Sequence, residues 1–340
     1  MLSYTGEKSK IRVSGILPIY NGERWILNNL PSILHSLRSF DELIIIDDGS
    51  IDKSLEMISD CAKRDSRVKV FKSQHNGLVS ALNFGISQAK NEWIARFDID
   101  DSYSKDRIIN QVQAIERTQD IGAVFADYQI LQNGERDRGR IYSPIFPIQT
   151  KLSLINSQRT AHPVALLNRS LVIKSGGYIE DQYPSEDIGL WIRLSQFSKL
   201  ISTSHVGLQY NRHSSSISSS FRSLSKSRKV QLSRTLAFSV EEENRLMNEF
   251  GNLFHEYDDL ENSNVRKYLF VFDYLTWILR KESNLTMRQS VKLIFGTVLP
   301  LLSTLKDAEV WGLNYRALQR KLERLYGYSI GKVSKYSRTV

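Results

Sequence analysis

The chain has 340 residues, 41% of them hydrophobic, and its formal net charge at pH 7 is +9. This length accommodates one large domain or two, and the hydrophobic content is that of a soluble globular protein. With a single cysteine, Cys61, we expect no intramolecular disulfide framework and no cysteine zinc site, and the sequence predicts neither a secretory signal nor a membrane-spanning helix.

Between residues 11 and 131, short apolar segments alternate with segments whose hydrophobic residues recur at helical spacing. We predict strands at 11–20, 42–47, 68–71, 93–98 and 122–131. We predict helices at 22–37, 51–64, 78–90 and 105–117. Pro18 is expected to end the first strand, and Ser50 to cap the second helix. Alternating strands and helices indicate an α/β fold, with a mostly parallel sheet flanked by helices.

After residue 132 the pattern weakens, and "NGERDRG" (133–139) predicts a hairpin or a loop. A further helix is expected at 185–197, with Ser185 as its cap. One face of this helix is apolar and should pack on the core; it carries Leu190, Trp191 and Leu194.

The last third of the chain reads as helical and follows the Ser-rich stretch 214–220. We therefore expect a catalytic domain at 1–221 and a helical C-terminal region at 222–340. This region holds 20 Lys and Arg against 13 Asp and Glu, and it contains two apolar runs, 268–279 and 293–302. It is expected either to contact an anionic membrane surface or to pack on the catalytic domain or on a second copy of the chain.

Two acidic clusters follow predicted strands: "IIIDDGSID" (44–52) and "ARFDIDD" (95–101). Because ligands bind beyond the carboxyl ends of strands in open α/β sheets, the two clusters should converge. Adjacent carboxylates repel one another, and a divalent cation would compensate that repulsion. Strand alternation would point Asp98 and Asp100 to one side and Asp101 to the other. The alternative is that Asp101 or Ser104 caps a helix and the rest is a polar turn.

Five segments together resemble, in order and spacing, the motifs of family 2 glycosyltransferases of the GT-A fold. They are "PIYNGERWI", "IIIDDGSID", "NGLVSALNFGISQAKNEWIARFDIDD", "HPVALLNRSLVIKSGGY" and "SEDIGLWIRL". The resemblance covers about residues 11–220. It implies transfer of a sugar from a nucleotide-sugar, usually with inversion at the anomeric carbon and with Mg or Mn as cofactor.

The resemblance also implies roles for residues at the donor side. Pro18, Ile19 and Tyr20 would lie beside the nucleotide base. Asp47 or Asp48, with Asp48 favoured, would contact uracil. In "DID", Asp98 would face the ribose. Three residues would hold the metal: Asp100, with Asp101 as the alternative ligand, and His213, which resembles a late histidine of some members. Each motif at a strand end also has a purely structural explanation. "PIYN" would then be a strand that ends at a proline, and "DDGS" would cap a helix.

The second chemical requirement is a base that takes the proton of the acceptor hydroxyl. Glu186 and Asp187 lie in the first turn of the predicted helix, where the helix dipole favours the anionic form and lowers a carboxyl pKa. The resemblance implies that Asp187 is the base, with Glu186 as the other catalytic candidate. Acids at this place also stabilise helices without any catalytic role. His162, in "AHPVA", matches a position near the acceptor side, although a lone histidine is more often structural.

We therefore expect an inverting, non-processive glycosyltransferase that uses a nucleotide-sugar, UDP-linked, and a glycan or lipid-linked acceptor. "LWIRLS" lacks the Gln-x-x-Arg-Trp signature of processive members. We expect a cytoplasmic protein, either free or peripheral on the inner face of the membrane, that does not bind nucleic acid and that is a candidate homo-oligomer.

Two alternative functions remain. A nucleotidyltransferase would need a Gly-rich basic loop after the first strand, and a non-catalytic membrane- or glycan-binding protein would not need both acid motifs.

Overall fold

The structure is a computed structural model that describes residues 10–132, 135–154 and 159–213, with residues 221, 224, 231–232, 235–242 and 244. All of them belong to the first of two compact units, Met1–Ser283. Most of the predicted helical region, including both of its apolar runs, therefore lies outside the described residues. The boundary at 221 stays a prediction. Within the described part of the chain, no helix is long and apolar enough to cross a membrane.

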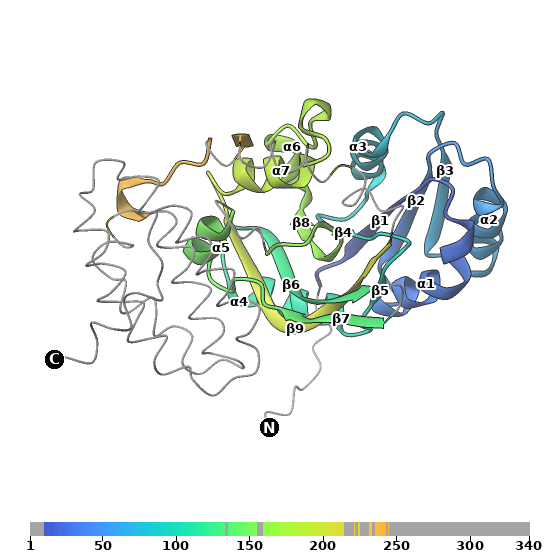
Figure 1. The fold of residues 1–340 in the computed structure, drawn as a ribbon, viewed down its shortest axis with the longest axis horizontal. Helices are drawn as coiled ribbons and strands as arrows, with labels where there is room; N and C mark the ends of the chain where they lie inside the picture. The colour runs from blue at the N-terminus through green and yellow to red at the C-terminus, as the bar shows by residue number, and fades with distance from the viewer. Residues whose placement is uncertain are drawn as a thin grey trace, which may run out of the picture. The chain divides into compact units, whose positions relative to one another are not determined.

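A nine-stranded mixed sheet forms the centre of the described fold (Figure 1). Its strands are β1 (Val13–Ile19), β2 (Glu42–Asp47), β3 (Val68–Lys72), β4 (Trp93–Arg96), β5 (Ser102–Tyr103), β6 (Ile121–Gln132), β7 (Glu135–Ile141), β8 (Leu166–Asn168) and β9 (Lys199–Arg212). The order is β3-β2-β1-β4-β8-β6-β9-β5, and β7 pairs antiparallel with β6; of the predicted alternatives for 133–139, hairpin or loop, this pairing favours the hairpin. Strands β3, β2, β1 and β4 are parallel, as are β6 and β9, whereas β8 is antiparallel to both of its neighbours.

Helices cover both faces of this sheet (Figure 1). They are α1 (Glu23–Ser36), α2 (Ser54–Arg64), α3 (Leu78–Gln88), α4 (Arg107–Arg117), α5 (Pro147–Ser153), α6 (Arg169–Lys174) and α7 (Glu186–Leu194), with 3₁₀ turns at His162–Val164 and Glu180–Gln182. The predicted α/β class is therefore confirmed. The chain places β2 and β3 on one side of β1 and then returns to place β4 on the other. This reversal creates a crevice at the carboxyl ends of β1 and β4, where ligands bind in open α/β sheets.

The core is continuous across the sheet, and every residue of β2 is buried. Leu190, Trp191 and Leu194 of α7 are fully buried, as predicted. Helix α3 packs very closely on β1 and β2 at Gly85. A Cβ atom there would lie 2.7 Å from Cγ2 of Ile16 and 2.8 Å from Cδ1 of Ile46. A side chain at this position would therefore force Ile16 or Ile46 to move.

Two predicted boundaries near the crevice are wrong. Strand β1 continues through Pro18 to Ile19, because its pairing with β4 has already ended at Ile16 and no partner needs the missing N–H of proline on that side. Ser50 does not cap α2, which begins three residues later than predicted. Its hydroxyl oxygen instead accepts the backbone N–H of Asn21 at 3.0 Å and so ties the β2–α2 loop to the end of β1.

Candidate active site

A cavity of about 990 Å³ lies at the crevice between β1 and β4. Its wall comes from two separate stretches of chain, 18–100 and 128–213. The first stretch contributes the ends of β1 and β4 and the loops beside them, and the second contributes α7 and the end of β9. The predicted residues on the wall are Pro18, Ile19, Tyr20, Asp48, Asp98, Asp100, His162, Glu186, Asp187 and His213. Sequence motifs up to 195 residues apart thus meet at one place.

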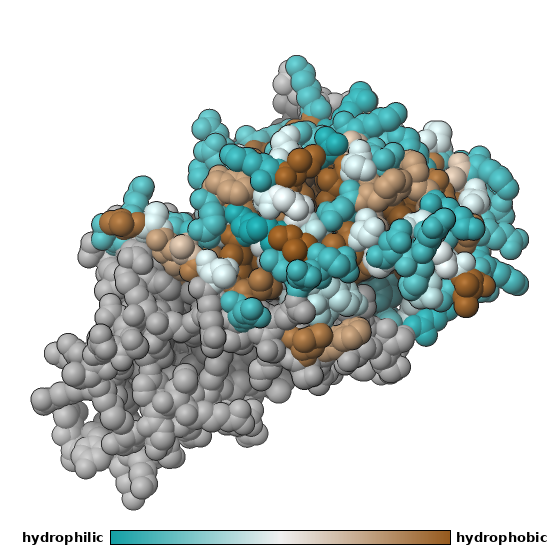
Figure 2. Space-filling model, turned by 90° about the horizontal axis from the view of Figure 1, so that it is seen from above, coloured by the Kyte–Doolittle hydropathy of each residue, from teal (hydrophilic) through white to brown (hydrophobic). Residues whose placement is uncertain are grey.

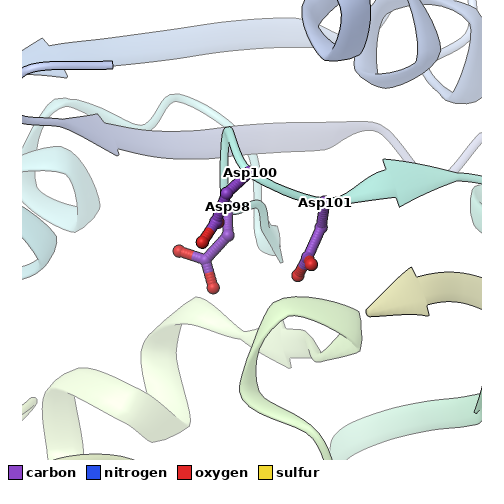
Figure 3. Close-up of side chains that lie close together, drawn as sticks. All are labelled: Asp98, Asp100 and Asp101. Atoms are coloured by element: carbon purple, nitrogen blue, oxygen red, sulfur yellow. The ribbon is translucent and has the colours of Figure 1, made fainter. Parts of the chain in front are cut away.

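Three carboxylates gather in the turn that follows β4 (Figure 3). One oxygen from each of Asp98, Asp100 and Asp101 lies within 4.8 Å of the others, and all three side chains point to the same side of the turn. The prediction that Asp101 points to the opposite side is wrong, because β4 ends at Arg96 and strand alternation no longer applies. Asp101 is buried, and its Oδ1 accepts the backbone N–H of Asn211 at 2.8 Å.

Two of these carboxyl groups, Asp100 and Asp101, have a raised pKa. Burial, Asp100 and Asp98 together raise the pKa of Asp101 well above its usual value. Burial and the charge of Asp98 raise the pKa of Asp100, and His213 opposes that rise. The Oδ2 atom of Asp101 is buried and has no hydrogen-bond partner among the residues that the structure describes. A cluster that holds acids against their own repulsion, with an unsatisfied oxygen among them, fits a divalent cation.

His213 is brought to this cluster by strand pairing. β5 follows the acidic turn directly and pairs with β9, so that Ser102 lies opposite Gln209. The residues just after Gln209 therefore return to the acids. Nε2 of His213 lies 2.8 Å from Oδ2 of Asp100, and the ring of His213 lies 5.0 Å from that of Trp25, centroid to centroid. One imidazole and carboxylate oxygens make a donor set that suits Mn better than Mg.

The buried side chain of Arg96 contacts the acid cluster at Asp98, and it was not predicted from the sequence. Its Nη2 donates to Oδ1 of Asp98 at 2.7 Å, and Nη1 donates to the carbonyl of Phe97. The hydroxyl of Tyr103 accepts the backbone N–H of Asp98 at 2.7 Å and fixes the start of the turn. The sequence signal for Arg96 was a charged residue inside an apolar strand, two positions before the first acid.

At the end of β2, only one member of the acid pair reaches the cavity. Asp48 lines it, and its two carboxylate oxygens accept the backbone N–H groups of Asn76 and Gly77, both at 2.9 Å. Asp47 is completely buried, and its Oδ2 accepts the N–H of Ser50 at 3.3 Å. The structure thus places Asp48, rather than Asp47, where a ligand can be contacted.

The ring of Tyr20 lies on the same wall and is 49% exposed. It is stacked on the ring of His75, with centroids 4.0 Å apart and planes inclined by 26°. His75 also lines the cavity. The sequence prediction did not include it, because a histidine in a polar loop carries no signal of its own.

Glu186 and Asp187 open the first turn of α7 and both line the cavity. Glu186 is 5% exposed, and within the described part of the chain its Oε2 has no hydrogen-bond partner. Burial, and next the charge of Asp187, raises the pKa of Glu186 to about 8. The expected lowering by the helix N-terminus is therefore wrong for Glu186, since the cost of burying its charge outweighs the helix dipole.

His162 lies between Glu186 and the interior. Its Nε2 is 2.8 Å from the hydroxyl of Tyr178, and its Nδ1 is 3.8 Å from Oε1 of Glu186. Burial, reinforced by the charge of Arg96, lowers the pKa of His162 well below its usual value. The imidazole is therefore neutral at physiological pH and supports the wall beside Glu186.

Comparisons with known proteins agree with this geometry. The family model for "Glycosyl transferase family 2" matches residues 14–176. An uncharacterized glycosyltransferase of Rickettsia felis is 30% identical over 184 residues, which are 54% of this chain and 30% of that protein. The poly-beta-1,6-N-acetyl-D-glucosamine synthase of Staphylococcus epidermidis is 29% identical over 190 residues, 54% of this chain and 46% of that protein. The chain thus spans less than half the length of either relative.

Two solved structures share the fold. One is S. aureus TarS 1–349 in complex with UDP-GlcNAc, with a TM-score of 0.58, 16% identity and 92% coverage of both chains. The other is the mannosyltransferase PcManGT from Pyrobaculum calidifontis in complex with GDP-Man and Mn²⁺. Its TM-score is 0.54 at 14% identity, covering 86% of this chain and 82% of that one. At these identities the likeness concerns the fold alone.

Proposed function

The chain belongs to glycosyltransferase family 2 and has the GT-A fold, and on this basis we propose that it transfers a single sugar, with inversion, from a UDP-linked donor to a glycan or lipid-linked acceptor. The observation that carries the proposal is that Asp98, Asp100 and His213 line the same cavity as the Glu186–Asp187 pair. A sugar held between them would have a leaving diphosphate on one side and an acceptor hydroxyl on the other.

The residues present fit a divalent cation. Asp100 and His213 would hold Mn or Mg, and the bound ion would offset the charge of the leaving nucleoside diphosphate. The buried Oδ2 of Asp101 makes it the alternative ligand. Arg96 keeps Asp98 in place through its 2.7 Å bond, so the acids are positioned before any ligand arrives.

We assign the base to Asp187. A base must be deprotonated at working pH, and a pKa of about 8 keeps Glu186 protonated at neutral pH. Glu186 is therefore suited to donate a hydrogen bond rather than to accept the proton. Asp187 takes the proton from the acceptor hydroxyl as that oxygen attacks the anomeric carbon. One such attack, from the face opposite the diphosphate, inverts the configuration.

At the donor side, Tyr20 with Pro18 and Ile19 would lie beside the nucleobase, and Asp48 would accept an N–H from its edge. Asp98 would face the ribose. The support is their place on one continuous wall that leads to the acid cluster. Asp48 keeps accepting capacity beyond its two backbone bonds, because a carboxylate offers about four lone-pair sites.

The acceptor proposed is a growing surface glycan, free or on a lipid carrier, and the enzyme would work at the inner membrane face. The support is the basic surplus of residues 222–340, which would attract anionic headgroups. On the described face seen in Figure 2, hydrophobic residues are scattered among hydrophilic ones. A homo-oligomer is the alternative use of the same region.

A donor screen tests the proposed function. The full chain is incubated with a panel of nucleotide-sugars with Mn²⁺ and with chelator, and release of nucleoside diphosphate is measured. We expect metal-dependent slow hydrolysis of one or more UDP-linked sugars. Absence of release and of nucleoside diphosphate binding across the panel would contradict the proposal.

A further inference from the structure

The stacked rings of Tyr20 and His75 are unusual because both are largely exposed. The side chain of His75 is 56% exposed, and Tyr20 is 49% exposed. By contrast, the Phe125–Trp191 ring pair of the core is fully buried. An exposed stack shields little apolar surface from water, so it adds little to the stability of the fold. Its place on the cavity wall points to a role in ligand binding.

The loop that carries His75 is held tightly against Asp48. Nδ1 of His75 lies 3.0 Å from the carbonyl oxygen of Asp48, and because a carbonyl can only accept, Nδ1 carries the proton. The next two residues donate their N–H groups to the carboxylate of Asp48, as described above. The imidazole is therefore anchored at its backbone and at one ring nitrogen.

Two backbone features allow this arrangement. His75 has a φ of +54°, and Gly49 has a φ of +77°. A Cβ atom on Gly49 would lie 3.0 Å from the backbone nitrogen of His75. With any other residue type at position 49, the loop that carries His75 could not come as close. A non-glycine residue with positive φ beside a cavity is the kind of outlier that indicates a functional constraint.

From these contacts we infer that His75 is a positioning residue for the donor. It holds one face of the Tyr20 ring so that the other face is ready to stack on the nucleobase. This inference rests on the proposed function, but it concerns a residue outside the motifs that carry the family resemblance. Without the imidazole, the Tyr20 ring rotates freely and must be ordered again when the donor binds, which lowers affinity.

Three variants separate the ring from the hydrogen bond. His75→Asn tolerates positive φ and keeps a donor but removes the ring. His75→Ala removes both, and His75→Phe keeps a ring without the N–H. We expect the Kd for UDP to rise about 3- to 10-fold in the Asn and Ala variants and to return toward the wild-type value in the Phe variant. His35→Ala, an exposed site on α1, is the matched control.

The binding experiment is isothermal titration of the full chain with UDP and with inorganic pyrophosphate, both with Mg²⁺. Pyrophosphate has no base, so its affinity should not change in any His75 variant. In a Tyr20→Ala background, His75→Asn should have no further effect on UDP, because it acts through Tyr20. Three results would each overturn the inference. One is an equal loss of affinity for pyrophosphate and for UDP in the His75 variants. The others are an undiminished effect of His75→Asn on UDP affinity in the Tyr20→Ala background, and wild-type UDP affinity in the His75→Asn variant. A wild-type protein that binds no UDP would instead contradict the proposed function.

Discussion

Nε2 of His213 lies 2.8 Å from Oδ2 of Asp100, although 113 residues separate them in the chain. The contact depends on β9, which pairs with the short strand after the acidic turn. The proposed metal site therefore takes a residue from the second half of the domain as well as the acids of the first half.

We predict that Asp100→Ala abolishes metal-dependent binding of UDP without unfolding the protein. The variant loses a proposed ligand, and it also relieves repulsion among three acids, so its unfolding midpoint at pH 7 should be unchanged or higher. Titration calorimetry of UDP with and without Mn²⁺ measures the effect. Asp120→Asn, an exposed acid away from the cavity, is the control. Metal-dependent affinity equal to that of the wild type would exclude the ligand role.

Asp187→Asn should keep UDP binding and lose transfer by about 10²-fold or more, as expected when a positioned base is removed. The amide is nearly isosteric but cannot take the acceptor's proton. Glu186→Gln should retain more activity, since a neutral amide resembles the protonated acid. Single-turnover transfer from the best donor would compare them. The base assignment is wrong if the Gln variant is inactive and the Asn variant turns over normally.

The buried Glu186 also predicts a pH dependence of stability. Its folded pKa of about 8 lies above the unfolded value near 4.5, so the fold favours the protonated acid. This contribution is complete below pH 4.5 and is lost as pH rises to about 8. Glu186→Gln should therefore gain stability relative to the wild type between pH 5 and pH 8, by about 2 kcal/mol or more. Urea unfolding at both pH values measures it, with the exposed Glu116→Gln as control. A pH-independent difference would contradict the prediction.

Gly85→Ala should destabilise the domain by about 1–3 kcal/mol, because the added methyl group meets Ile16 and Ile46 at less than 3 Å. Ser87→Ala, on the exposed side of the same helix, serves as the control. Thermal and chemical unfolding would report the change. A Gly85→Ala variant as stable as the wild type would show that α3 can move away from the sheet at little cost.

The proposed membrane contact predicts that the full chain co-sediments with anionic vesicles at low salt and is released at high salt, because charge attraction is screened within about 8 Å at physiological ionic strength. Neutral vesicles are the control. Failure to bind anionic vesicles even at low salt would leave residues 222–340 as packing or as an oligomer interface.

Much of the fold could be predicted, because β1 to β4 are short, apolar and separated by amphipathic helices. Strand β9 could not. Its residues, "KLISTSHVGLQYNR", mix apolar and polar side chains without alternation, since the strand is only partly covered and its pairing with β6 is irregular. Its formation depends on β6 and β5 rather than on local pattern.

The site shows the same division. That Asp48 and Asp100 meet at one cavity could be predicted, because acids that follow the parallel strands of one sheet converge at its carboxyl edge. Arg96 was missed, because its burial depends on neighbours that the sheet brings to β4: Arg96 lies opposite Ile16 of β1, and its backbone N–H donates to the carbonyl of Ala165. Ser50 was misassigned as a cap, since its hydroxyl is engaged across the crevice by Asn21 instead of by its own helix. Contacts between residues that are far apart in the sequence, rather than local propensity, determine where such residues lie and what they bind.

The two stretches that build the cavity wall suggest how such enzymes diversify. On the proposed assignment, residues 18–100 recognise the donor, and the stretch 128–213 holds Asp187, the base that acts on the acceptor. Recombination between relatives in the segment 101–127 would exchange acceptor preference as a block while donor preference is inherited intact. His213 is the point at which the two parental halves must be compatible, because it reaches back to Asp100.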